Sequence, residues 1–252
     1  MSGHSKWAGI KHHKMAQDAK RGKVFTKIIR ELSIAARTGG SNPENNPRLR
    51  KAMEQAREAN MPSDNVKKAI QRGTGELPGM TLEEVVYEGY GPGGVAVIVN
   101  ATTDNKNRTT NEIRKIFSNS GGNLAESGSV AWMFKLKGYV TVEKSKIGED
   151  DLMSLAIESG AEDFRSDDED VYEIITVTDD LEKVTQALKS KNVPVASSEI
   201  TQLPNAYIKL GGKEAEQMLN LMNGLEDHDD VGQVFANFDI PKEIMEKVEA
   251  AL

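Results

Sequence analysis

Residues 85–101, VVYEGYGPGGVAVIVNA, mark the point where the sequence changes from a helical to a strand pattern. Val, Ile and Tyr recur here with a period of two, which predicts strands over 85–90 and 95–101 joined by a turn at Gly91 to Gly94. The glycines also fit the G-x-G-x-x-G pattern of dinucleotide-binding sites, but that pattern requires a helix next, and a strand pattern follows instead. No lysine follows either, so we interpret the stretch as a hairpin turn rather than a phosphate-binding loop.

Upstream of this hairpin, the sequence predicts helices with clear end signals. Apolar residues recur over 25–36 at spacings of three and four, which predicts a helix that a pair of glycines ends. A second helix is predicted to begin after the cap residue Asn46 and to run to the break at Pro62. A third, short helix is predicted to be capped by Ser63 and to stop at Gly73. The simplest arrangement of these elements is a three-helix bundle.

Downstream of the hairpin, helices and strands alternate. A helix is predicted at 106–118, capped by one of Thr103, Asp104 and Asn105, and a strand at 130–134. Residues 137–202 then follow the βαββαβ order of ferredoxin-like folds, with elements at 139–142, 151–159, 163–165, 171–177, 181–190 and 195–201. A helix at 214–225, a strand at 231–238 and a terminal helix at 241–252 complete the prediction.

The predicted fold class is therefore α+β with several domains. The N-terminal three-helix bundle occupies residues 1–80. Residues 81–135 and 204–252 form a discontinuous α/β domain, since the last elements resume the pattern that stops near residue 134. Residues 136–203 form the ferredoxin-like domain inserted in it.

Charge is distributed very unevenly over these three parts. The 252 residues carry a net charge of −7, which by itself argues mildly against binding to nucleic acid. Residues 1–80, however, contain 16 basic and 7 acidic residues and carry +9, whereas the discontinuous domain carries −7 and the insertion −9. One end of the chain is thus suited to approach phosphate, and the acidic remainder would confine contact to that end.

The candidate nucleic-acid-binding residues are concentrated in the first 37 positions. They are Lys6, Trp7, Lys11, His12, His13, Lys14, Lys20, Arg21, Lys23, Lys27, Arg30 and Arg37. On the predicted helix, the basic side chains from Lys23 to Arg37 lie on the arc opposite the apolar one, with Ile34 as the one apolar residue among them. A solvated face is the alternative, but Glu31 is the only acid near this arc. Reversing the charges of Lys23, Lys27 and Arg30 is therefore expected to abolish polyanion binding and to leave the fold intact.

Trp7 from this list, and two further candidates, Lys106 and Arg108, have a different basis. Trp7 could stack on an unpaired base or pack against the bundle. Lys106 and Arg108 lie in the predicted first turn of a helix, where the macrodipole disfavours cations, so they hint at an anionic partner. If Asp104 is an ordinary N-cap of this helix, however, it explains half of the segment Thr102 to Thr109 without an anionic partner.

Several classes of site are excluded or disfavoured. The chain has no cysteine, which rules out disulfides and thiolate metal sites and favours a cytoplasmic location. We expect no secretory signal and no membrane contact, because no apolar run approaches the length of a membrane span. Asp227, Asp229 and Gly232 match part of a calcium loop, but Val231 and Phe238 occupy two other ligand positions. No catalytic framework stands out, so we expect neither an enzyme nor a cofactor or metal.

Long motifs give the chain a family resemblance. They are GHSKWAGIKHHKMAQDAKRGKVFTKIIREL (3–32), NPRLRKAMEQAREANMP (46–62), RGTGE (72–76), YEGYGPGGVAVIV (87–99), TDNKNRT (103–109), GGNLAESGSVAWMF (121–134) and LEDHDDV (225–231). In these motifs the chain resembles the YebC/PmpR family nearly end to end. The resemblance implies three domains: a helical N-terminal domain, a second domain of the α/β type, and a third domain, also α/β, inserted in the second. It also implies a function, since bacterial members are labelled probable DNA-binding transcriptional regulators and the mitochondrial relative activates translation of a cytochrome oxidase subunit.

Two functions remain open on these residues. A DNA-binding transcriptional regulator could use helices 47–60 and 63–72 as a helix-turn-helix, with Asn65, Lys67, Lys68, Gln71 and Arg72 on the reading helix. A ribosome-associated translation factor would instead insert the basic module into rRNA or tRNA, while its acidic domains contact protein. In both cases a monomer is expected, because no dimerisation heptads are present.

Overall fold

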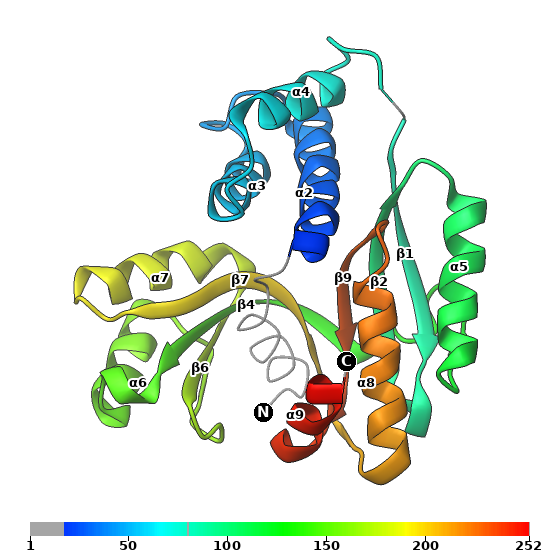
Figure 1. The fold of residues 1–252 in the computed structure, drawn as a ribbon. Coiled ribbons are helices and arrows are strands. Elements are labelled where there is room, and N and C mark those ends of the chain that lie inside the picture. Colours follow the sequence, from blue (N-terminus) through cyan, green and yellow to red (C-terminus); the bar gives the residue numbers. More distant parts are fainter. Residues whose placement is uncertain (1–17, 80, 252) are drawn as a thin grey trace. The chain divides into compact units, whose positions relative to one another are not determined.

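The computed structural model describes residues 18–79 and 81–251, with side chains described from residue 22 to residue 248. These residues form a mixed α+β structure (Figure 1) that divides into two compact units. One unit is Trp132–Tyr207, and the other combines the described residues up to Ala131 with those from Ile208 onward. The insertion predicted over 136–203 lies within the first of these. None of the described helices has both the length and the apolar character needed to cross a membrane.

Three helices make up the described part of the N-terminal region. They are α2 (Asp18–Gly39), α3 (Pro47–Glu58) and α4 (Ser63–Gly73), as the periodicity predicts. Their shared core includes Leu32, Leu49, Ala56 and Ala69, each at most 1% exposed. The predicted cap at Ser63 is wrong, because Pro62 is the N-cap and no side chain caps α4. The carbonyl of Pro62 already accepts the amide of Asn65, so the helix starts one residue earlier than the serine suggests.

Asn46 caps α3 as predicted, and its replacement should weaken this region. Its Oδ1 accepts the amide of Leu49 at 3.0 Å, and its Nδ2 donates to the carbonyls of Ala35 and Gly40, both at 2.8 Å. Because Asn46 is only 4% exposed, Asn46→Ala is expected to lower the free energy of unfolding by about 2 kcal/mol. Urea denaturation followed by circular dichroism measures this loss. Asn45→Ala, at an exposed neighbour, is the control, and an equal loss there would contradict the prediction.

The larger unit also contains a four-stranded antiparallel sheet. Its strands are β1 (Glu83–Tyr90), β2 (Ala96–Thr103), β3 (Asn123–Leu124) and β9 (Val231–Ala236), in the order β3-β1-β2-β9. The 85–101 stretch forms the predicted hairpin, with a 3₁₀ turn at Pro92–Gly94 in which Gly93 has a φ of 68°. Helices α5 (Lys106–Asn119) and α8 (Gly212–Glu226) pack side by side and against this sheet. The last helix is α9 (Lys242–Ala251).

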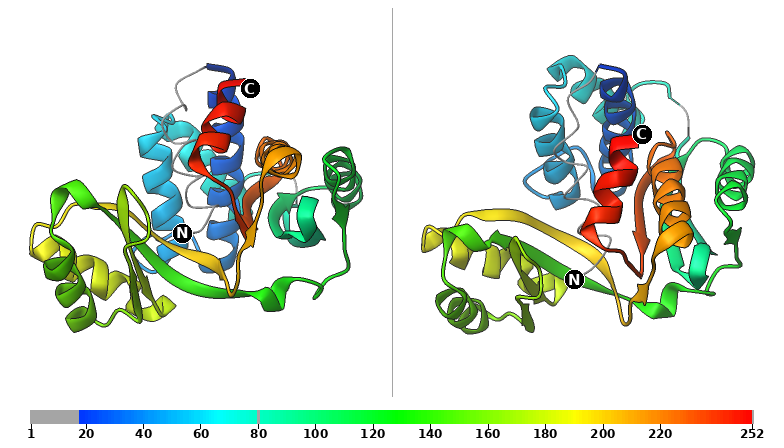
Figure 2. Two further views of the ribbon diagram at one scale, coloured as in Figure 1. Left: turned by 90° about the horizontal axis from the view of Figure 1, so that it is seen from below. Right: turned by 60° about the horizontal axis from the view of Figure 1, so that its bottom comes forward.

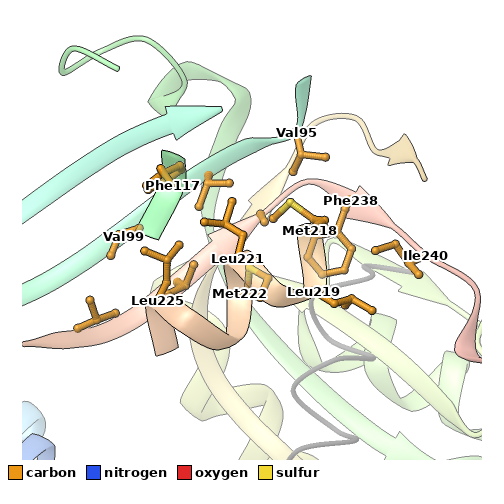
Figure 3. Close-up of a cluster of buried hydrophobic side chains, with 14 of the residues drawn as sticks. Val95, Val99, Phe117, Met218, Leu219, Leu221, Met222, Leu225, Phe238 and Ile240 are labelled. Carbon is orange, nitrogen blue, oxygen red and sulfur yellow. The ribbon is translucent and has the colours of Figure 1, made fainter. Parts of the chain in front are cut away.

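The core of this unit lies between β2, β9 and the two long helices. Figure 3 shows side chains of this core from these elements and from the segments next to β2 and β9, among them Val95, Val99, Phe117, Met218, Leu219, Leu221, Met222, Leu225, Phe238 and Ile240. Half of these labelled residues belong to α8, and aliphatic and Met side chains dominate, as the low aromatic content of the sequence implies. This core includes residues next to both ends of β2 and the first residue of β9, and so positions Thr103 and Asp230, which follow and precede these core residues.

Two predicted strands differ from the structure. The segment 130–134 is a 3₁₀ turn at Ala131–Met133 rather than a strand, because buried Glu88 accepts the amides of Val130 and Ala131 and thereby removes them from sheet pairing. The predicted strand 231–238 is broken at Asn237. There the Asn237 side chain accepts the amide of Ala96 at 2.8 Å, which ends β9. The next strand, β10 (Phe238–Asp239), pairs in parallel with β8 (Ile208–Lys209), which the sequence did not reveal.

The smaller unit has the predicted βαββαβ order. Its elements are β4 (Phe134–Glu143), α6 (Glu149–Ser159), β5 (Asp163–Arg165), β6 (Val171–Thr176), α7 (Leu181–Ser190) and β7 (Val195–Pro204). The sheet order β5-β6-β4-β7, with all neighbours antiparallel, is that of a ferredoxin-like fold. Figure 2 shows α6 and α7 on one side of these strands, where Val140, Leu152 and Leu188 are fully buried. Gly138 allows α7 to approach, since a Cβ there would lie 2.9 Å from that of Leu181.

Candidate functional site

The predicted nucleic-acid-binding residues are only partly within the described chain. Lys6, Trp7, Lys11, His12, His13 and Lys14 lie outside the described residues, and for Lys20 and Arg21 the structure gives only the backbone, within α2. The candidates with described side chains are Lys23, Lys27, Arg30, Arg37, Lys106 and Arg108. We call the first four the basic stripe of α2.

The basic stripe faces away from the helical core, as predicted, but it is not simply solvated. Arg37 is exposed. Lys27, in contrast, donates to the carbonyl oxygen of Glu226, and Arg30 donates to that of Asp229. Arg30 also forms an ion pair of 2.7 Å with Asp230, and its side chain is only 19% exposed. The alternative of a solvated face therefore does not hold for the middle of the stripe.

The partner of the stripe is the last residue of α8 and the short connection that leads from it to β9. We call residues Glu226–Asp230 the acidic segment. Besides the contacts of Lys27 and Arg30, it provides Asp227, whose carboxylate lies 3.6 Å from Lys23 Nζ. Reversing Lys23, Lys27 and Arg30 to acids would place three carboxylates beside this segment. The premise of the expected intact fold, that these side chains are free, does not hold, because the stripe makes intramolecular contacts that the helical wheel could not show. We now expect the reversal to destabilise this contact as well.

Asp230 is the centre of this arrangement. Its residue is 3% exposed, and its Oδ2 accepts from Thr103 at 3.0 Å, Thr109 at 2.5 Å and Arg108 at 2.9 Å, while Oδ1 faces Arg30. Burial alone would raise the pKa of Asp230, but the hydrogen bonds from Thr109 and Arg108 and the charge of Arg30 outweigh it, so the pKa lies below its ordinary value. The carboxylate is thus held ionised by donors from β2, α5 and α2.

Lys106 and Arg108 occupy the first turn of α5, as predicted, and differ in their surroundings. Arg108 bonds to Asp104 and Asp230, both at 2.9 Å, and these two acids raise the pKa of its guanidinium above the ordinary value. An anion inside the protein therefore explains a cation at this helix N-terminus, and no external partner is required for it. Lys106 is exposed, and no side-chain partner is found for it in the described part of the chain.

The same cluster includes His228, which lies in the acidic segment. His228 Nδ1 accepts the amide of Asp230 at 3.1 Å, and Nε2 lies 2.9 Å from Glu112. Within the described residues, Glu112, His228 and Asp230 bring potential metal-ligand atoms within 4.8 Å of one another. Arg30 and Arg108 already balance the charge of Asp230, however, and both ring nitrogens of His228 are engaged. These contacts favour a hydrogen-bonded ion cluster over a metal centre.

Sequence reasoning missed a second ion-pair cluster, centred on Arg48. It also gave little weight to exposed Lys and Arg side chains on α3 and α4 that form no ion pair in the described residues, which we call the free cations. Arg48 of α3 pairs with Glu31 at 2.6 Å and with Glu84 at 2.7 Å, and these carboxylates raise the pKa of its guanidinium. Exposed cations on α3 and α4 have no side-chain partner in the described residues; they are Arg50, Lys51, Arg57, Lys67, Lys68 and Arg72. The sequence singled out three of them only as part of a possible helix-turn-helix. Their spacing on the helices was the signal that could have identified all six.

A groove lies beside these free cations. Its volume is about 600 Å³, and its lining includes apolar Met53, Val66 and Ile70 together with the cations Arg57 and Lys67. It is formed by α3, α4 and the turn between them. The lining also includes the acids Asp64 and Glu76, so charges of both signs border this groove.

Together, the basic helices, the antiparallel sheet with α5 and α8, and the ferredoxin-like unit define a mixed α+β protein in which only the N-terminal part of the sequence carries a net positive charge. The chain belongs to the TACO1/YebC family. Residues 5–76 match the TACO1/YebC N-terminal domain, and residues 82–238 match the TACO1/YebC second and third domains. The resemblance identified from the motifs is thus confirmed.

Individual relatives match over almost the whole chain. A probable transcriptional regulatory protein of Endomicrobium trichonymphae is 60% identical over 251 residues, covering 99% of this chain and 100% of that one. A protein of the same description from Dictyoglomus turgidum is 55% identical over 249 residues, with 98% and 100% covered. The crystal structure of a conserved hypothetical protein from Aquifex aeolicus is similar with a TM-score of 0.77 and 50% identity, covering 89% of this chain and 92% of that one.

Proposed function

We propose that this protein is a cytoplasmic, non-catalytic regulator of gene expression that binds DNA through its basic N-terminal helices. The names of its relatives, probable transcriptional regulatory proteins, support a regulatory role. The observation that carries the proposal is the set of six exposed cations on α3 and α4 that have no acidic partner in the described residues. The candidate cations from Lys6 to Arg37, and Lys106, belong to the same proposal.

The physical basis is attraction to phosphate. Each Lys or Arg that neutralises a phosphate releases condensed counterions, so affinity depends steeply on salt and little on base sequence. The other parts of the chain carry −7 and −9 and would repel a polyanion. Contact is thereby directed to the helices, where Asn65 and Gln71 belong to the same helix, α4, as Lys67, Lys68 and Arg72 and can hydrogen-bond to bases.

The decisive variant reverses three free cations of α4. Lys67→Glu, Lys68→Glu and Arg72→Glu should weaken binding to a mixed-sequence DNA duplex at least tenfold. The slope of log affinity against log salt should become less steep by about 3, roughly 0.9 for each phosphate that is no longer neutralised. Fluorescence anisotropy in a salt series measures both quantities. These side chains are exposed and unpaired in the described structure, so the fold should be retained.

A matched control uses α7 of the ferredoxin-like unit and the residue that follows it. Lys183→Glu, Lys189→Glu and Lys191→Glu change the net charge equally at exposed positions, and should alter affinity less than twofold. Equal weakening by both triple variants would mean that only the total charge matters. That result would contradict a binding face on α4.

The second candidate function is that of a ribosome-associated translation factor. The same cations would suit rRNA or tRNA, because phosphate contacts dominate recognition of either nucleic acid. Cosedimentation with ribosomes in a salt series separates the two. Retention on ribosomes at physiological salt, without selectivity for any promoter duplex, would favour translation over transcription.

A further inference from the structure

The acidic segment presents carbonyl and carboxylate oxygens to the basic stripe. Backbone carbonyl oxygens of Glu226 and Asp229 accept from Lys27 and Arg30, and the carboxylates of Asp227 and Asp230 face Lys23 and Arg30. Lys and Arg make the same type of contact with phosphate oxygens. Three of the four cations of the stripe are therefore engaged by oxygens of the protein itself.

From this geometry we infer that the acidic segment is an internal competitor that occupies the basic stripe in the free protein and leaves it when nucleic acid binds. The inference rests on the proposed function and concerns the regulation of the same surface. In the free protein, α3 and α4 present accessible cations, and Arg37 is also exposed. Lys23, Lys27 and Arg30 add their own phosphate contacts only after the segment has been displaced.

The acidic residues of the segment differ in their contacts: Asp230 is bonded to the core of the larger unit, whereas Asp227 and Asp229 lie at the surface next to the stripe. Asp230 is buried and bonded to Thr103, Thr109 and Arg108, so it holds β9 against β2 and α5. Asp227 and Asp229 are exposed. In the described structure, the carboxylate of Asp227 has Lys23 as its ion-pair partner, and that of Asp229 has none. These two acids add negative charge next to the stripe without contributing to the core.

The exposed end of the contact, at Lys23 and Asp227, has the strength expected of a reversible competitor. Lys23 and Asp227 are 48% and 64% exposed, so their pair is weakened by salt and can exchange with another anion. A competitor within the same chain acts at an effective concentration in the millimolar range, roughly, which reduces the fraction of molecules whose stripe is free. The apparent affinity falls by that fraction, and any change that opens the segment restores it.

A covalent tether tests whether displacement is needed. The chain has no cysteine, so Lys23→Cys with Asp227→Cys offers a unique pair for a short bismaleimide. The tethered protein should bind a mixed-sequence DNA duplex at least tenfold more weakly than the same variant capped with a monomaleimide. Duplex added before the reagent should slow tether formation. Equal affinity of the tethered and capped proteins would overturn the inference.

A second pair of variants tests the charge of the segment without touching the basic residues. Asp227→Asn with Asp229→Asn should tighten binding to the same duplex by roughly three- to tenfold. The matched control, Asp150→Asn with Asp151→Asn at exposed positions of α6, removes the same charge from the other compact unit and should change affinity less than twofold. Equal effects of both pairs, or no effect of either, would count against an internal competitor.

The outcomes distinguish the internal competitor from the proposed function. If the unmodified protein binds neither DNA duplex nor RNA even at low salt, the proposed function fails, and the internal competitor fails with it. If the unmodified protein binds, and both the tether and the Asp227/Asp229 variant leave binding unchanged, only the competitor fails. Tighter binding of Asp227→Asn/Asp229→Asn together with loss of binding in the tethered protein supports both.

Discussion

Asp230→Ala is expected to lower the free energy of unfolding of the larger unit by about 3–5 kcal/mol, because it removes one partner of a buried ion cluster. The side chain of Asp230 is 2% exposed and accepts from both Arg30 and Arg108. Without it, two guanidiniums and the hydroxyls of Thr103 and Thr109 lose their shared acceptor. The substitution therefore weakens the attachment of α2, β2 and α5 to the start of β9 at once.

Amide hydrogen exchange measures the loss where it occurs. The amide of Thr102 donates to the carbonyl of Asp230 at 2.7 Å, so exchange in β2 should accelerate strongly. Exchange in β6, which belongs to the other compact unit, serves as an internal reference. Asp229→Ala changes the exposed neighbouring acid and should have little effect. Similar exchange in the Asp229 and Asp230 variants would refute the central role of Asp230.

Glu88→Ala is expected to have the next largest effect, a loss of about 2–4 kcal/mol, since it leaves buried amides without an acceptor. Glu88 is 4% exposed, and its two carboxylate oxygens accept the amides of Gly128, Val130 and Ala131 at 2.7 to 2.8 Å. Proteolysis at 125–131, together with amide exchange of that segment, measures the loss. Glu84→Ala, on the same strand but half exposed, is the control and should cost less than 1 kcal/mol, roughly the value of a surface pair.

The contribution of Glu88 should also depend on pH in a defined direction. Burial would raise the pKa of Glu88, but hydrogen bonds from three backbone amides lower the pKa by a larger amount. The folded-state pKa therefore lies below the ordinary value. The stabilisation is therefore fully present above the unfolded-state pKa and is lost as pH falls through the lower, folded-state pKa. Unfolding free energies of the native chain should fall below about pH 4, and the Glu88→Ala variant should show a smaller fall.

The sequence predicted most elements because their determinants are local. Periodicity and caps such as Asn46 defined α3 to α8 and the end of α2 within a few residues, although α2 begins seven residues before the apolar run, and the alternation over 85–101 defined the first hairpin. The strand breaks at 131–133 and at Asn237 were missed because they depend on bonds to Glu88 and Ala96, which lie far away in the sequence. Strands of two residues, such as β8 and β10, are too short to show an alternation of apolar and polar residues.

The candidate site shows the same limit more sharply. A helical wheel correctly separated Lys27 and Arg30 from the core of the helical bundle, but it could not show that Glu226–Asp230 lies on them. The contact joins residues about 200 positions apart, each with an ordinary local pattern. Burial of Ile34, at 1% exposure, is consistent with a covered surface on that side of α2. The isolated apolar residue among the cations was the one local sign of such a cover.

The way in which the ferredoxin-like unit is connected has a consequence for its history. Its first and last strands pair with each other, with Phe134 opposite Pro204, and the amide of Asn205 donates to the carbonyl of Met133 at 2.8 Å. The points where the chain enters and leaves this unit are thus adjacent. A gene segment that encodes it can be gained, lost or exchanged at the cost of one short turn, without changing the register of any strand in β3-β1-β2-β9.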